Sequence, residues 1–176
     1  MAGEPLHPAP GSPAAADSPE AFLARGRAVL VSQSFSTLIG AHLHALAPGQ
    51  CELHVPITPS LLQQHGFAHG GVVSYAADNA LTYAGGTAMR VPVITSEFKI
   101  NYVRPAVGEL LIARAHAVHH GRTQAVCRCD VFAVEGGVEK LCAVAQGTIV
   151  ALPPREGSTP PGAASDAGTQ AVGRPD

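Results

Sequence analysis

Residues 69–84 have the sequence HGGVVSYAADNALTYA, in which Asp78 is the only formally charged side chain when histidine is neutral. The run has no proline and lacks the strict alternation of a half-buried strand, and its alanines suit a helix that is packed closely on several sides. We therefore predict a central, largely enclosed helix from Gly70 to about Ala84, ended by Gly85-Gly86.

Asp78 is an unusual residue for the middle of such a helix. A carboxylate is seldom fully buried without a partner, because it loses its hydration on burial. An exposed position fits no better, since the neighbouring residues from Ala77 to Leu81 form no charged face. We therefore interpret Asp78 as a catalytic group.

The paired glycines at the start of the helix, Gly70 and Gly71, have no Cβ. A substrate could therefore approach the unpaired N–H groups of the first turn, where the helix dipole favours developing negative charge, as in an oxyanion hole. Asp78 follows Gly70 by eight residues, which is roughly 12 Å along a helix axis. If both residues act on one carbonyl, two chains must share the site, as a symmetric dimer would allow.

Further elements are expected on both sides of this helix. Ser18 and Pro19 are typical of a helix start and predict a short helix through about Val31. Turn signals separate strand candidates at residues 37–47, 51–57, 94–103, 109–119, 123–134 and 140–151. Short links join the last four, which predicts an antiparallel meander. The expected fold class is α+β, with an antiparallel β-sheet of about six strands wrapped around a long central helix.

Length and composition fit one domain with tails. The chain has 176 residues, of which 46% are hydrophobic, enough to bury a core. Residues 1–17 and 153–176 are rich in Pro, Gly, Ala and Ser, so we expect disordered tails around a domain at 18–152. A net charge of −2 with 14% charged residues provides no basic stripe for nucleic acid and no cationic cluster for a membrane surface, so neither partner is expected.

Cysteine usage and the chain start favour a cytoplasmic protein. We find neither a basic stretch followed by an apolar core nor an arginine-rich presequence, and the apolar run around Asp78 is too short to span a bilayer. The cysteines form no CxxC pair, so we expect buried reduced thiols rather than disulfides or a zinc site; they are Cys51, Cys127, Cys129 and Cys142.

Two stretches that flank the helix resemble a known family. Residues 63–71 (QQHGFAHGG), the acidic Asp78 and residues 95–106 (TSEFKINYVRPA) are similar to the hotdog-fold acyl-CoA thioesterases of the phenylacetate-degradation, PaaI-like type. The resemblance covers about residues 35–151. It implies the hotdog fold, hydrolysis of an acyl-CoA thioester to a carboxylic acid and coenzyme A, no metal or organic cofactor, and a homodimer or a homotetramer made of two dimers.

The resemblance also implies roles for four catalytic residues. Gly70 would donate its backbone N–H to the thioester oxygen, and Asp78 of the neighbouring protomer would act as general base or nucleophile. Gln63 stands where the family commonly has an asparagine that holds the carbonyl or the attacking water, and its amide offers the same chemistry. Thr95 corresponds to the family's hydroxyl residue that assists the water.

Six further residues are candidates for binding substrate, namely His69, Gly71, Tyr75, Ser96, Arg104 and Arg122. The two arginines could reach the phosphates of coenzyme A, and Tyr75 could line an acyl pocket, with solvent exposure or core packing as the structural alternatives. His69 stands at the helix entrance, where it suits orientation of the backbone. No metal pair is expected of His65 and His69, because Gly66 and the loop context spoil a helical spacing.

Two other functions stay open at this point. One is a non-catalytic acyl-CoA-binding hotdog protein, against which Asp78 argues, because an isolated carboxylate adds a burial cost to a pure binder. The other is a hotdog hydratase or dehydratase, which would be expected to place a histidine and an acid together near the acyl β-carbon. The sequence leaves the acyl group open among phenylacetyl, hydroxylated aromatic, short-chain and medium-chain thioesters.

Overall fold

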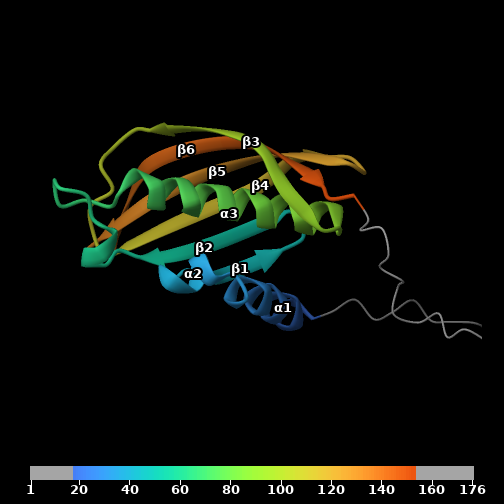
Figure 1. Cartoon of the computed structure of the whole chain (residues 1–176), viewed down its shortest axis with the longest axis horizontal. Helices are drawn as coiled ribbons and strands as arrows, with labels where there is room; N and C mark the ends of the chain where they lie inside the picture. The colour runs from blue at the N-terminus through green and yellow to red at the C-terminus, as the bar shows by residue number, and fades with distance from the viewer. Residues whose placement is uncertain (1–17, 154–176) are drawn as a thin grey trace, which may run out of the picture.

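A six-stranded antiparallel sheet curves around one long helix in the computed structural model, which describes residues 18–153 (Figure 1). In chain order the elements are α1 (Pro19–Val31), α2 (Ser34–Leu38), β1 (His42–Ala47), β2 (Gln50–Pro56), a 3₁₀ turn (Pro59–Leu61), α3 (Gly70–Met89), β3 (Val93–Tyr102), β4 (Leu110–His120), β5 (Gln124–Glu135) and β6 (Val138–Ala151). The predicted fold class is confirmed. The predicted tails lie outside the described residues, apart from Pro153.

The strands stand in the order β1-β2-β4-β5-β6-β3. The predicted meander holds for β4, β5 and β6, but the predicted hairpin link between β3 and β4 is wrong, because β3 pairs with β6 at the edge of the sheet. Residues 103–109 cross the end of the sheet instead. Seven extended residues reach about 24 Å, more than the roughly 14 Å that separates strands three positions apart.

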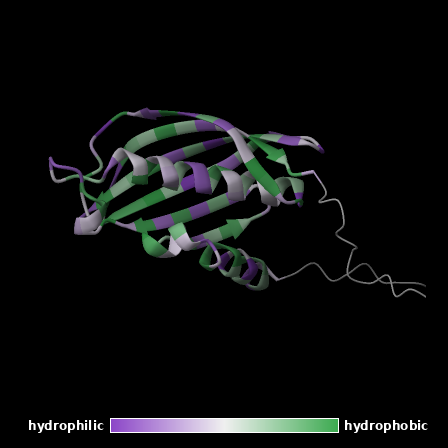
Figure 2. Cartoon of the chain, viewed as in Figure 1, coloured by the Kyte–Doolittle hydropathy of each residue, from purple (hydrophilic) through white to green (hydrophobic). Residues whose placement is uncertain are grey.

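The helix α3 packs its small side chains against the concave face of the sheet. Ala76, Ala77, Ala80 and Ala84 have no exposed surface. One strongly hydrophilic turn interrupts the middle of the helix, while the strands around it carry hydrophobic bands (Figure 2). Within residues 18–153, no helix combines the length and the apolarity needed to cross a membrane.

The predicted end of the central helix at Gly85-Gly86 is wrong, because α3 continues to Met89. It ends at Arg90, whose left-handed backbone (φ 58°) closes the last turn with an N–H bond to Gly86 O. A Cβ on Gly85 would lie only 2.7 Å from Ile149 Cβ of β6. Gly85 therefore serves close contact between the helix and the sheet rather than helix termination.

We expect Gly85→Ala to unfold at a lower urea concentration than Gly86→Ala. Both variants gain the same helix propensity, but the new methyl at position 85 meets three Ile149 atoms at 2.7–2.9 Å, whereas that at position 86 meets the tip of Val93 at 3.0 Å. Overpacking of this kind costs about 1–3 kcal/mol. Urea unfolding followed by circular dichroism measures the two unfolding midpoints. Equal midpoints would show that Ile149 can move aside to accommodate the new methyl group.

The predicted strand at residues 37–47 is wrong in its first part, where Ser34–Leu38 form the short helix α2. The Thr37 hydroxyl donates to Val31 O at 3.1 Å and lies 3.3 Å from Gln33 O. Such local bonds from a threonine side chain favour a turn over a strand. The other predicted strands agree with the structure to within about two residues at each end.

The two edges of the sheet differ in how they are covered. At the β1 edge α1 packs alongside, with Gly26 against Leu46, and Arg27 Nε donates to Leu43 O at 2.9 Å. Within residues 18–153, strand β3 has a neighbour on one side only. Its exposed side chains include Ile94 and Tyr102, each about half exposed (53% and 52%). A ten-residue open edge of this kind is suited to pairing with another strand.

Candidate active site

Asp78 lies in the middle of α3 and borders a pocket of about 900 Å³ between α1, α3 and the start of β3. Its Oδ1 atom is buried and has no hydrogen-bond partner among residues 18–153. Asp130 shares this feature, but Arg128 lies 3.6 Å from its oxygen. A buried carboxylate oxygen without a donor is costly and calls for an explanation, which a reacting water or a substrate at this pocket would supply.

Two threonines connect Asp78 to the sheet. The Thr82 hydroxyl donates to the main-chain oxygen of Asp78 at 2.8 Å, and it also lies 2.8 Å from the Thr95 hydroxyl. Both threonines border the pocket of Asp78. Sequence reasoning selected Thr95 but missed Thr82, although its position four residues after Asp78 puts both on one face of the helix.

The bulge in β3 decides between the two neighbouring hydroxyl candidates. Between β3 and β6, Thr95 pairs with Ile149 and Glu97 pairs with the neighbouring Thr148. Ser96 has no pairing partner on β6 and is the extra residue of the bulge. Ser96 is exposed and does not border the pocket, whereas Thr95 does. The predicted substrate contact of Ser96 therefore lacks support from this pocket, while Thr95 borders the pocket of Asp78 and its predicted role stays a prediction.

A second pocket, of about 580 Å³, opens at the start of α3 and is bordered by Gly70, Gly71 and Gln63. His69 caps the helix, since its Nδ1 accepts the Gly71 N–H at 3.0 Å. The Gly71 N–H is thereby occupied, whereas the Gly70 N–H has no hydrogen-bond partner within residues 18–153. Gly70 thus offers a free donor at the positive end of a helix.

Tyr102 forms a wall of this second pocket and was not among the predicted site residues. Its hydroxyl donates to Gly70 O at 3.0 Å and is also in hydrogen-bond contact with Ser74. A Cβ on Gly70 would lie 3.6 Å from the same hydroxyl. The contact joins the end of β3 to the start of α3, which no local sequence signal could have indicated.

The structure thus separates the four predicted catalytic residues into two pairs. Asp78 and Thr95 border the first pocket, Gly70 and Gln63 border the second, and the two pockets have no lining residue in common. Both Gly70 and Asp78 lie on the straight run of α3, so the predicted separation of roughly 12 Å holds.

The two candidate arginines lie at opposite ends of β6. Arg104 borders the second pocket and donates to Leu141 O at 3.1 Å. Arg122 lies in the turn beside Thr123, whose main-chain oxygen accepts the N–H of Ala151. Leu141 and Ala151, the β6 residues beside Arg104 and Arg122, are ten positions apart, which is about 33 Å along a strand. Within one chain, the two guanidinium groups therefore cannot hold the phosphates of one molecule.

Tyr75 faces α2 rather than either pocket. Its hydroxyl donates to Ser36 Oγ at 2.6 Å and accepts from Asn79 Nδ2 at 3.0 Å, and its ring meets Phe35 edge-on at 5.2 Å. Burial raises the pKa of the Tyr75 hydroxyl. Gln33 Oε1 completes the network by accepting from both Ser36 and Asn79. These contacts give Tyr75 a clear structural task, which is to fasten α2 to α3.

The cysteines do not supply a nucleophile. All four are buried and unpaired, as predicted. Burial raises the pKa of Cys127 and of Cys142 to about 11. Because the thiolate is the reactive form, these thiols are inert at neutral pH. Asp78 is the carboxylate that borders the first pocket.

Comparison with known proteins identifies the family of this chain. The thioesterase superfamily matches residues 65–140. A thioesterase family protein from Silicibacter pomeroyi is 37% identical, with 74% of this chain and 98% of that chain covered and a TM-score of 0.71. A mutant of the phenylacetic acid degradation protein PaaI from Thermus thermophilus is 33% identical, with 68% and 100% covered and a TM-score of 0.60.

A sequence relative from Saccharolobus solfataricus, whose name marks it as an unconfirmed esterase, is 31% identical over 123 residues, which cover 69% of this chain and 80% of the relative. The family match spans α3, β3, β4, β5 and the first residues of β6, and so includes Gly70, Asp78 and Thr95. The chain therefore belongs to the thioesterase superfamily, as a thioester hydrolase with the hotdog fold.

Proposed function

We propose that the protein hydrolyses an acyl-CoA thioester at a site that two protomers share. The proposal rests on Oδ1 of Asp78, which is buried beside the Thr82–Thr95 hydroxyl pair and has no hydrogen-bond partner in the described part of the chain. A carboxylate held in this way can take a proton from water or attack a carbonyl carbon itself, in either case leading to loss of the coenzyme A thiolate.

Gly70 supplies the second requirement of the reaction. Its free N–H stands at the helix start, where it can stabilise the negative charge that develops on the thioester oxygen. Gln63 borders the same pocket and can hold the carbonyl or the attacking water with its amide. These two residues and the pair of Asp78 and Thr95 are thus two halves of one catalytic set.

The open edge of β3 provides a way to join the two halves. If β3 pairs antiparallel with β3 of a second copy, the start of one strand faces the end of the other. Thr95 near the start contacts the helix turn that follows Asp78, and Tyr102 at the end contacts Gly70. Pairing of this kind brings the Asp78 half of one protomer toward the Gly70 half of its partner.

The helix α1 and the start of β3 shape the expected acyl site. Apolar side chains border the pocket of Asp78, and the most prominent are Phe22, Val29, Leu46, Tyr83, Val93 and Ile94. Such a lining fits the hydrocarbon part of an acyl group. We propose a cytoplasmic enzyme that acts as a homodimer or a dimer of dimers and that takes aromatic or short- to medium-chain aliphatic acyl-CoA.

The test is a panel of acyl-CoA thioesters, assayed by release of free thiol. We expect hydrolysis of at least one aromatic or short- to medium-chain substrate. Binding of acyl-CoA measured by calorimetry without thiol release across the panel would instead favour a non-catalytic binder. Loss of the enoyl-CoA absorbance at constant thiol would favour a hydratase, and either outcome would overturn the proposal.

A further inference from the structure

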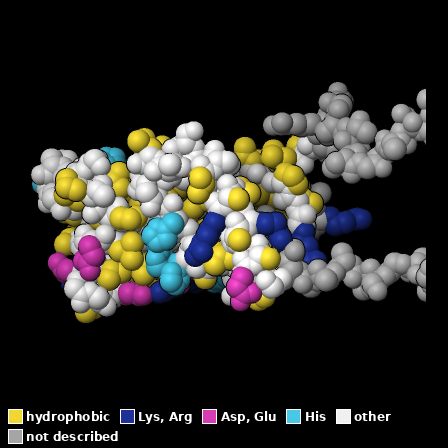
Figure 3. Space-filling model, turned by 90° about the horizontal axis from the view of Figure 1, so that it is seen from below, with side chains coloured by type: hydrophobic (Ala, Val, Ile, Leu, Met, Phe, Trp, Pro, Cys, Tyr) yellow, Lys and Arg dark blue, Asp and Glu magenta, His cyan; other side chains and the backbone are white. Residues whose placement is uncertain are grey.

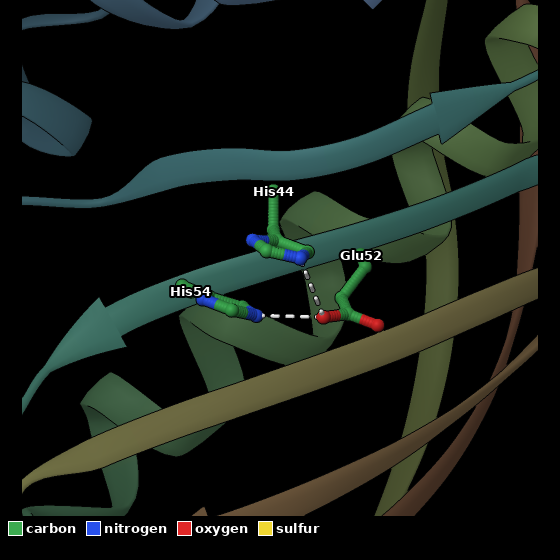
Figure 4. Close-up of side chains that lie close together, drawn as sticks. All are labelled: His44, Glu52 and His54. Atoms are coloured by element: carbon green, nitrogen blue, oxygen red, sulfur yellow. Dashed lines mark hydrogen bonds and ion pairs between the residues drawn. The ribbon is translucent and has the colours of Figure 1, made fainter.

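Three side chains with metal-binding atoms meet on the outer face of the sheet, away from both pockets near α3. They are His44 on β1 and Glu52 and His54 on β2 (Figure 4). One ligand atom from each lies within 4.8 Å of the other two. Glu52 Oε1 lies 2.7 Å from His54 Nε2 and 3.9 Å from His44 Nε2.

Strand alternation and a bulge bring these residues together. Glu52 and His54 are two apart on β2, so both project from the face opposite to the buried Leu53. On β1, Leu43 and Ala45 pair with consecutive residues of β2, so His44 is the extra residue of a bulge. The bulge turns the His44 side chain toward Glu52. Figure 3, seen from the side of β1 and α1, shows a group of histidines at the surface.

A hydrogen-bonded partner fixes the carboxylate. Arg114 Nε donates to Glu52 Oε2 at 2.8 Å, and Arg114 is held in turn by both carboxylate oxygens of Glu139. Glu52 Oε1 is left facing the histidines. A ligand that is oriented by a second residue is typical of metal sites in proteins.

The hydrogen bond between His54 and Glu52 sets a requirement for a cation to bind. In the present contact the His54 Nε2–H donates to Glu52 Oε1 at 2.7 Å, because a carboxylate oxygen can only accept. The ring proton must therefore lie on Nδ1 when Nε2 binds the ion.

The geometry points to a binding site for one divalent transition-metal ion of the zinc type, held by His44, Glu52 and His54. Two imidazole nitrogens and one carboxylate oxygen are a ligand set that suits such ions, and water would complete the coordination. The site goes beyond the proposed hydrolysis, since its residues border neither the pocket of Asp78 nor that of Gly70.

Small side-chain movements complete the site. Bonds of about 2.0–2.1 Å in a tetrahedral arrangement place ligand atoms roughly 3.4 Å apart, between the 2.7 and 3.9 Å now seen from Glu52. The rings of His44 and His54 are stacked at 4.4 Å and 7°. Because a metal lies in the plane of each ring that binds it, His44 must turn out of the stack, and its 61% exposure leaves it room to do so.

A bound ion would link β1 to β2, because its ligands come from both strands. The ion would tie the bulge of β1 to the centre of β2 and stabilise the folded chain, since it binds the native arrangement in preference to the unfolded one. The site is therefore expected to change stability without taking part in hydrolysis.

The test uses the untagged full chain after treatment with a chelator. Calorimetric titration with Zn²⁺ and visible absorption with Co²⁺ should each show one equivalent bound per chain. His44→Ala and Glu52→Gln should weaken binding at least about tenfold, because even outer-shell changes cost 10–100-fold at metal sites. Zn²⁺ should raise the melting temperature of the wild type more than that of either variant.

His119→Ala is the matched control, because His119 is also an exposed strand histidine but lies outside the cluster. It should bind like the wild type. His44 is largely exposed, so its loss should leave the fold intact, which circular dichroism checks. The proposal is overturned if the wild type takes up no equivalent of either ion, or if His44→Ala and Glu52→Gln bind as tightly as His119→Ala.

Discussion

Replacing Asp78 by Asn or Ala should lower turnover of the best acyl-CoA substrate by at least about 100-fold. The substitution removes the carboxylate that borders the first pocket, and with it the group that activates water or attacks the thioester. Steady-state thiol release gives kcat and KM. The loss should fall mainly on kcat, because Asp78 is proposed to act on the reacting atoms rather than on the coenzyme A part.

Asp130→Asn is the matched control for this prediction. Asp130 also has a buried carboxylate oxygen without a hydrogen-bond partner among residues 18–153, but it borders neither the Asp78 pocket nor the Gly70 pocket. Its variant should keep activity. Size-exclusion chromatography and circular dichroism should show that the Asp78 variants stay folded and assembled. Hydrolysis near the wild-type rate by folded Asp78→Ala would remove this residue from the mechanism.

Mixing two inactive variants should restore activity if the site is shared. Asp78→Ala lacks the carboxylate, and Gly70→Val blocks the helix start, where even a Cβ would lie 3.6 Å from the Tyr102 hydroxyl. A hybrid dimer would hold an intact Gly70 from one chain opposite an intact Asp78 from the other. Free exchange makes half of the dimers hybrid with one good site each, so recovery should approach about a quarter of wild-type activity.

The control for this experiment is proof that subunits exchange. Labelling the two variants with different fluorophores and following energy transfer would show when hybrids have formed. Each variant mixed with itself should stay inactive. Exchange without recovery would place the complete catalytic set within one chain, in spite of the roughly 12 Å along α3 between Gly70 and Asp78.

The central helix and most strands were predictable because their signals are local. The proline-free, alanine-rich run fixed the helix, and turn residues between apolar runs fixed the strands. The helix end could not be predicted in this way. Gly85-Gly86 is a typical helix stop by local preference, yet a contact with Ile149, distant in sequence, requires a glycine inside the helix.

The candidate site was predictable in part for the same reason. The glycines at the start of the helix and the lone Asp78 are visible in the sequence, whereas Thr82 and Tyr102 gain their contacts only when α3 and β3 pack together. The link from β3 to β4 has a length that fits either a hairpin or a crossover. The pairing partner of β3 therefore depends on the tertiary fold, and local sequence does not determine it.

The position of β3 also has a consequence for how the chain folds. Strands β4, β5 and β6 are consecutive and can pair through short turns. Strand β3 pairs with β6, for example Tyr102 with Ala143, and can do so only after the chain has returned through β4 and β5. Closing that longer loop costs more entropy and slows the step. The hydroxyl pair of Thr82 and Thr95 forms only when β3 docks. We therefore expect the proposed catalytic set to be completed late in folding, when β3 also presents the edge that would receive a second chain.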